Sequence, residues 1–144
     1  MNMRRFTFLL IITLAATTTL ADKKESLESL KQRAEQASEA QQVDLLMKVA
    51  ELQLQVADEA YTAGNSDQAQ QALKDVVSYG VRAGQAAATT GKKMKHTEIS
   101  LRKISARLEE LRRSVNVDDR PPLVAAVDSL EKVRTELLTR MFRK

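Results

Sequence analysis

Apolar residues recur along most of this chain at intervals of three or four positions, the spacing of one face of an α-helix. Between residues 92 and 115 the two intervals alternate strictly, as they do in the seam between packed helices. This series is Met94, Thr97, Leu101, Ile104, Leu108, Leu111 and Val115. A second series follows a similar rule at Leu123, Ala126, Leu130, Val133, Leu137 and Met141. The pattern predicts an all-α fold.

Few residues interrupt the helical pattern. The chain of 144 residues contains 4 glycines and 2 prolines, whereas proteins average roughly 7% and 5%. Gly64, Gly91 and Pro121-Pro122 mark the breaks, and they separate expected helices at about 43–63, 67–90, 92–115 and 121–143. Each would be roughly 32 to 36 Å long. Matched lengths and short loops predict an up-down antiparallel four-helix bundle, with residues 43–144 as the bundle domain.

Two glycines fall inside the second expected helix rather than at its ends. Gly80 and Gly84 are four residues apart, on the same face as Ala83 and Ala87. Glycine inside a helix costs about 1 kcal/mol relative to alanine. We therefore expect a neighbouring helix to approach the backbone closely at this face.

Residues 22–42 form an N-terminal helical extension that the bundle does not require. The apolar face of this segment holds only Leu27, Leu30, Ala34 and Ala37, and its other positions are rich in charge. An isolated helix of this length is marginal in water. We predict that the extension is the most mobile part of the mature chain and that self-association or partner docking begins there. In the alternative, it folds back and covers the bundle through Leu27 and Leu30.

The first 21 residues have the layout of a secretory signal peptide. Arg4 and Arg5 precede an apolar run over residues 6–16, and Thr19 and Ala21 occupy the −3 and −1 positions of a cleavage site. The run is shorter than the roughly 20 apolar residues of a membrane span. We expect cleavage after Ala21, export to the periplasm or cell exterior, and no transmembrane segment in the mature chain. The alternative is an uncleaved membrane anchor.

Charge is distributed unevenly along the sequence. The formal net charge is +4, and residues 22–91 carry 11 acids and 7 bases whereas residues 92–144 carry 8 acids and 14 bases. Together with Leu27 and Leu30, the basic cluster supplies the candidate interaction surface, at Lys92, Lys93, Lys95, Arg102, Lys103 and Arg107. An anionic envelope component, either lipid or cell-wall polymer, suits this cluster. Nucleic acid does not, because export removes it and no aromatic residue interleaves the bases. The alternative is a solvated helix face balanced by the acidic first half.

The residue types needed for most catalytic and metal sites are missing or badly spaced. The chain has no cysteine and one histidine, which excludes thiolate sites and any site with two imidazoles. His96 and Glu98 imitate the start of a zinc-deaminase signature, but its two cysteines do not exist. Asp118 and Asp119 are too few for calcium. We expect no enzyme activity, no cofactor and no bound metal.

Two segments resemble known proteins. Six residues resemble the middle of a tetratricopeptide hairpin: Ala57, Ala60, Tyr61, Gly64, Ala69 and Leu73. The spacing differs from that family, because two residues separate Tyr61 from Gly64 where the family has three. Residues 108–142 resemble the terminal helical hairpin of small exported bacterial proteins of unknown function. This resemblance implies an exported all-α protein and names no activity. The sequence predicts a non-enzymatic helical interaction or scaffold protein, or alternatively an electrostatic binder of anionic envelope components.

Overall fold

The computed structural model describes residues 18–143, with side chains described from residue 27 onward, and these residues are helical almost throughout. The prediction of an all-α protein is confirmed for them. Most of the predicted signal peptide lies outside the described residues. The elements are α1 Thr18–Gln36, α2 Glu39–Thr62, α3 Ser66–Thr90, α4 Met94–Ser114, the short 3-10 helix η1 Val117–Asp119, and α5 Arg120–Phe142.

Local chemistry explains where the helices end. Gly64 and Gly91 adopt φ angles of 76° and 68°, in the left-handed region where glycine is not strained. Asn65 caps α3, since its side-chain oxygen accepts a hydrogen bond from the backbone N–H of Gln68 at 3.2 Å. Pro121 and Pro122 lie in the first turn of α5, where a missing N–H costs nothing. The three breaks expected from the sequence are therefore the observed turns.

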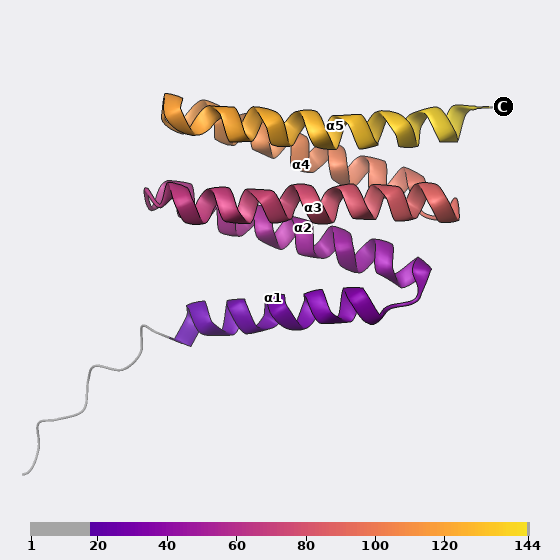
Figure 1. The fold of residues 1–144 in the computed structure, drawn as a ribbon, viewed down its shortest axis with the longest axis horizontal. Coiled ribbons are helices and arrows are strands. Elements are labelled where there is room, and N and C mark those ends of the chain that lie inside the picture. The colour runs from indigo at the N-terminus through magenta and orange to yellow at the C-terminus, as the bar shows by residue number, and fades with distance from the viewer. Residues whose placement is uncertain (1–17, 144) are drawn as a thin grey trace, which may run out of the picture.

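Successive helices run antiparallel and form two layers, with α3 and α5 in front of α2 and α4 (Figure 1). The main packing partners are α2 with α3, α4 with α5, and α3 with α5. In a closed up-down ring of four helices α2 would also pack along α5, and that pair is not among the main contacts of the described residues. The helices are instead packed in the order α2, α3, α5 and α4, and α4 also contacts α2, so that α5 lies beside α3 rather than beside α2.

The two glycines of α3 explain why α5 lies there. A Cβ atom on Gly84 would lie 2.1 Å from Cγ1 of Val133, and one on Gly80 would lie 2.8 Å from Cδ2 of Leu130. Both neighbours belong to α5. The backbone of α3 therefore approaches α5 more closely than any side chain would permit, as the glycine spacing predicted.

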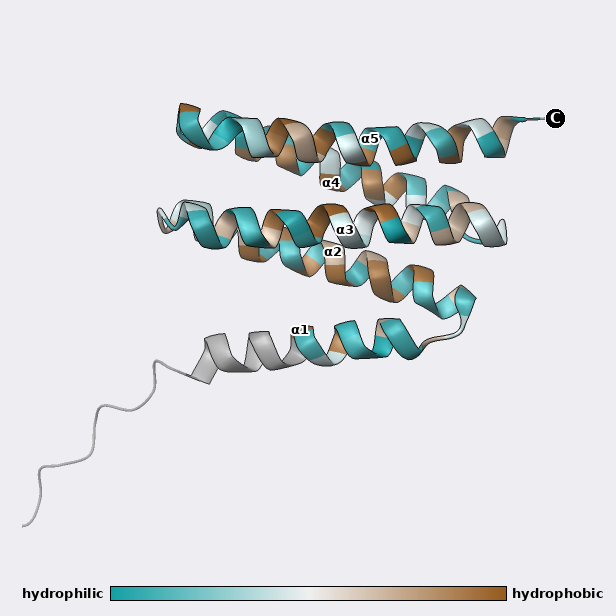
Figure 2. Cartoon of the chain, viewed as in Figure 1, coloured by the Kyte–Doolittle hydropathy of each residue, from teal (hydrophilic) through white to brown (hydrophobic). Residues whose placement is uncertain are grey.

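One buried cluster runs through the helices. It is built mainly from leucine, valine and alanine, and its largest completely buried side chains include Leu46, Leu101, Leu108, Leu123, Leu130 and Leu137. Apolar and hydrophilic residues alternate along each helix (Figure 2), because each helix turns one face to this cluster and the other to solvent. Thr97, Ser100 and Ser105 of α4 are also buried. Their small side chains contribute little apolar area to the core.

Helix α1 folds back against α2, which is the alternative stated for residues 22–42. The chain leaves helical geometry at Ala37 and Ser38 and then reverses direction. Leu27 and Ala34 are buried and Leu30 is half-buried. The side-chain amide of Gln42 donates to the backbone oxygen of Ala34 at 3.2 Å, which holds the turn closed. Polar contacts with α3, described next, supplement the thin apolar face of α1.

Candidate functional site

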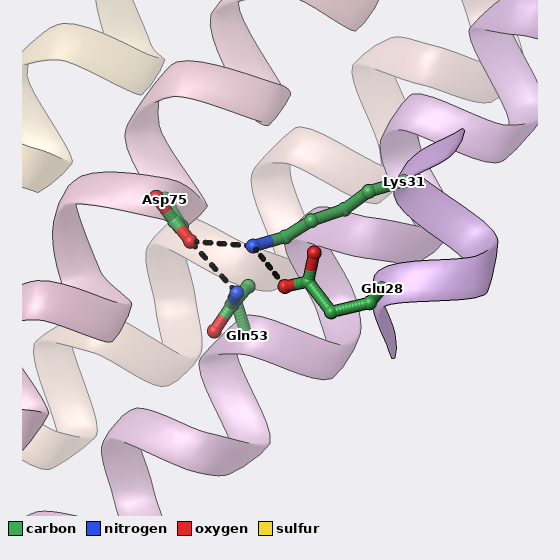
Figure 3. A network of polar contacts seen from close by, with 4 residues as sticks. All are labelled: Glu28, Lys31, Gln53 and Asp75. Carbon is green, nitrogen blue, oxygen red and sulfur yellow. Dashed lines mark hydrogen bonds and ion pairs between the residues drawn. The ribbon is translucent and has the colours of Figure 1, made fainter. Parts of the chain in front are cut away.

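A polar cluster joins α1, α2 and α3 at the point where the three helices meet (Figure 3). The ammonium of Lys31 lies 3.1 Å from Oδ2 of Asp75, and the side-chain amide of Gln53 donates to the same oxygen at 2.8 Å. Glu28 adds a longer contact of 3.4 Å to Lys31. Gln53 is buried, with 5% of its surface exposed. The cluster links α1 to both α2 and α3 through polar contacts.

An aromatic ring extends this cluster along α3. The Lys31 ammonium and the Arg82 guanidinium lie 5.8 and 5.3 Å from the centre of the Tyr79 ring. Arg82 also forms an ion pair with Glu35 of α1 at 2.7 Å. A cation at this distance from an aromatic face gains roughly 0.5 to 1 kcal/mol. Helix α1 is therefore attached to α3 by charge as well as to α2 by apolar packing.

The pKa of Lys31 is raised by its partners. Burial by itself lowers the pKa of an ammonium, but the hydrogen bond and the charge of Asp75, together with Glu28, outweigh burial. Burial and then the charge of Asp119 also raise the pKa of the Tyr61 phenol. Both groups make the folded state favour the form present at neutral pH.

We predict a loss of stability in alkali that depends on Lys31. A folded-state pKa above the unfolded value of about 10.4 gives stability that is complete below that pH and is lost as the pH rises through the folded pKa. The Lys31→Met variant should lose about 1 kcal/mol at pH 7 and should show a shallower decline of melting temperature between pH 9 and 11.5 than the unaltered protein. Lys74→Met removes an exposed lysine of α3 that has no ion pair among the described residues. If Lys74→Met changes the pH dependence as Lys31→Met does, the loss of stability in alkali does not come from Lys31.

Two of the predicted basic residues are held by acids of α2. Lys93 forms an ion pair with Asp44, and Arg107 lies 2.6 Å from Asp58 and 2.8 Å from Glu110. Hydrogen bonds from Arg107 to Asp58 and then to Glu110 raise the pKa of its guanidinium. These two residues therefore help to fix α4 beside α2.

The two leucines predicted for the interaction surface belong to α1. Leu27 is buried, and Leu30 is only partly exposed.

The remaining predicted bases lie on the outer surface. Lys92, Lys95, Arg102 and Lys103 are exposed, and the described residues provide no ion pair for them. Arg113 has the same character. We define the α4 basic ridge as Lys95, Arg102, Lys103 and Arg113. The structure thus divides the predicted cluster into bases that join helices and bases that face solvent.

Buried charge also joins α4 to α5. Glu98 is buried, and it lies 2.6 Å from Arg134, which is also 2.7 Å from Glu131. Hydrogen bonds to Glu98 and then to Glu131 raise the pKa of Arg134. His96 is exposed. His96 and Glu98 imitate the start of a zinc-deaminase signature in the sequence. In the structure His96 faces solvent, whereas Glu98 is buried in a contact between α4 and α5.

Two hollows flank the beginning of α4. One lies between α2 and α4 and is lined by Asp44, Met47, Lys48, Glu51, Lys93 and His96. The other is lined by Ala88, Met94, Thr135, Glu136, Thr139, Arg140 and Arg143. Within residues 27–143, no group of three or more histidine and acidic side chains is arranged to hold a metal ion.

The sequence reading did not place Arg140 and Arg143 near the basic cluster. The C-terminus of α5 and the α3–α4 turn lie at the same end of the stack (Figure 1), and Arg140 donates to the backbone oxygen of Ala88 at 3.4 Å. The nearly equal expected lengths of segments 92–115 and 121–143 could have predicted that the end of α5 lies beside the start of α4. Antiparallel helices of equal length place the end of one beside the start of the other.

No match to this chain was found among protein-family models, curated proteins or solved structures. Among the described helices, none combines the length and the apolar character that a membrane span requires.

Proposed function

We propose that the mature protein, residues 22–144 after cleavage following Ala21, is an exported, non-enzymatic scaffold that binds a protein partner or a second copy of itself. The observation that carries this proposal is a set of three exposed or half-buried apolar residues on one side of α5, which we call the apolar strip although Glu131 and Thr135 lie between its two ends. Val124 and Phe142 are 40% and 77% exposed, and Leu138 is half-buried. These three residues project within about 40° of one line along the helix.

The polar groups support the same proposal. Glu98, Gln53 and Asp75 are used in contacts between helices, so these three side chains serve the fold. The exposed apolar residues of α5 lie on the side of that helix that faces neither α3 nor α4 inside the buried cluster. A binding surface on α5 is consistent with both features.

The test compares two charge variants of α5. Val124→Asp with Phe142→Asp should abolish partner retention or self-association of the exported protein, because a carboxylate in an apolar contact is costly. Lys132→Asp, an exposed position on the same helix, should leave association unchanged. The association should persist in high salt, since apolar contacts are not screened. Loss of association in both variants would refute a role for the apolar strip, and recovery of an uncleaved N-terminus by mass spectrometry would refute export.

The α4 basic ridge supports a second candidate, electrostatic binding of anionic envelope components. Its four bases face solvent without an ion pair among the described residues. Binding through exposed charges weakens steeply as salt rises, because counterions screen interactions beyond about 10 Å at 0.1 M. A salt titration therefore separates the two candidates.

A further inference from the structure

The geometry points to the α4 basic ridge as a docking surface for an anionic lipid bilayer, with α4 lying flat on the membrane. This inference rests on the second candidate function, which it deepens by naming the surface and the partner. The bases concerned are Lys95, Arg102, Lys103 and Arg113, and all four are exposed.

These bases lie on one side of a straight helix. At 100° per residue, Lys95, Arg102 and Arg113 project within about 20° of one line, and Lys103 projects about 80° to one side. The distance from Lys95 to Arg113 along the axis is about 27 Å at 1.5 Å per residue. A planar surface can therefore contact all four side chains at once.

Carboxylates beside the ridge are already bound by bases that do not belong to it. Glu109 lies 2.7 Å from Arg112, and Glu110 lies 2.8 Å from Arg107. On the flank toward α2, Asp58 is held by Arg107 and Asp44 by Lys93. Arg107 is shared by Asp58 and Glu110, so three bases offset three of these four acids and one negative charge remains. The four bases of the ridge exceed that remaining charge, and the surface stays positive for an external anion.

The side chains between the bases favour a lipid surface over a soluble acidic chain. Ile99 and Ala106 project between the bases within about 40° of the same line, and the ion-paired Glu109 and Glu110 project within about 60° of it on either side. Ile99 is half-buried without belonging to the core, and Ala106 is exposed. A helix face that combines bases with apolar side chains suits the boundary between headgroups and acyl chains. Each base near an anionic leaflet strengthens binding about fivefold.

The test measures binding to vesicles by flotation, with protein recovered from its host and its N-terminus defined by mass spectrometry. The unaltered protein should bind vesicles of equal phosphatidylcholine and phosphatidylglycerol at 50 mM salt, and should not bind phosphatidylcholine alone. The ridge variant, with Lys95, Arg102, Lys103 and Arg113 all changed to Gln, should bind at least about tenfold more weakly.

A matched control removes the same charge elsewhere. Arg33, Lys74, Lys132 and Arg143 are exposed and have no ion pair among the described residues. Changing these four to Gln should alter binding by no more than about threefold. A charge-conserving variant with Arg102→Lys and Arg113→Lys should bind as the unaltered protein does.

The remaining outcomes overturn the inference. Equal losses in the ridge and control variants would show that only net charge matters. Equal binding to neutral vesicles would show that the ridge is not the determinant. Ridge-dependent binding to soluble polyglutamate without binding to vesicles would refute the lipid partner and retain the electrostatic function. Binding to neither anion would refute both.

Discussion

Replacing Gly84 with alanine should destabilise the protein by about 2 kcal/mol, although alanine is the better helix former by about 1 kcal/mol. The added Cβ would lie 2.1 Å from Cγ1 of Val133, a distance at which α5 or its side chain must move. Valine has one strongly preferred rotamer in a helix, so its methyl group cannot simply turn away. The melting temperature should fall by roughly 8 °C, as calorimetry or circular dichroism would show.

Three further variants test the explanation. Adding Val133→Ala to Gly84→Ala should restore part of the lost stability, because it removes the methyl group that the new Cβ meets. Gly80→Ala should cost less, since its nearest neighbour is the flexible end of Leu130 at 2.8 Å. Gln85→Ala changes an exposed position of the same helix and should have no destabilising effect. A stabilised Gly84→Ala variant would show that α3 and α5 are not in close contact.

The glycine pair shows how far sequence reasoning reaches. The cost of Gly80 and Gly84 within a helix predicts that some neighbour approaches closely, and it does. The sequence pattern does not identify that neighbour, because every helix of the chain has an apolar face that would fit. Contact with α5 depends on the order in which the helices stack. Because of this long-range choice, the helices follow one another around the two layers in the order α2, α3, α5, α4 rather than in chain order.

Helix positions were predictable because they depend on local chemistry. Gly64, Gly91 and Pro121 act through backbone conformation within a few residues, and the expected helices begin and end within a few positions of the observed ones. The break near Ser38 carries no glycine or proline. It is fixed by the packing of α1 against α2 and by the hydrogen bond from Gln42 to Ala34. Because these contacts are not visible in the local sequence, the break was not predicted.

The basic character of the candidate surface was predictable from the sequence, but the division between paired and unpaired bases was not, because the pairs join distant segments. Composition identifies 92–113 as a basic region, but it does not say which bases are free. Lys93 and Arg107 are held by Asp44 and Asp58, residues 49 positions away in sequence. Only the adjacency of α2 and α4 reveals these pairs, and the α4 basic ridge is what remains after they are removed.

Placing a charge at Ala34 should detach α1 from the stack. Ala34 is 0% exposed and belongs to the same buried cluster as Val43 and Met47 of α2. A carboxylate there would be buried without a partner, which costs more than the docking of one short helix can supply. In the Ala34→Glu variant, amide hydrogens of residues 27–36 should exchange almost as fast as in an unfolded chain, while those of α2 to α5 stay protected.

Gln36→Glu provides the matched control for that variant. It introduces the same charge two residues further along, at an exposed position of the same helix, so protection of α1 should be unchanged. If Ala34→Glu keeps full protection, α1 does not pack through Ala34. If it unfolds the whole protein, α1 is required for the fold, and residues 37–144 do not form an independent unit. Detachment of α1 alone would show that packing at Ala34 is required to attach α1 and that α2 to α5 are stable without it.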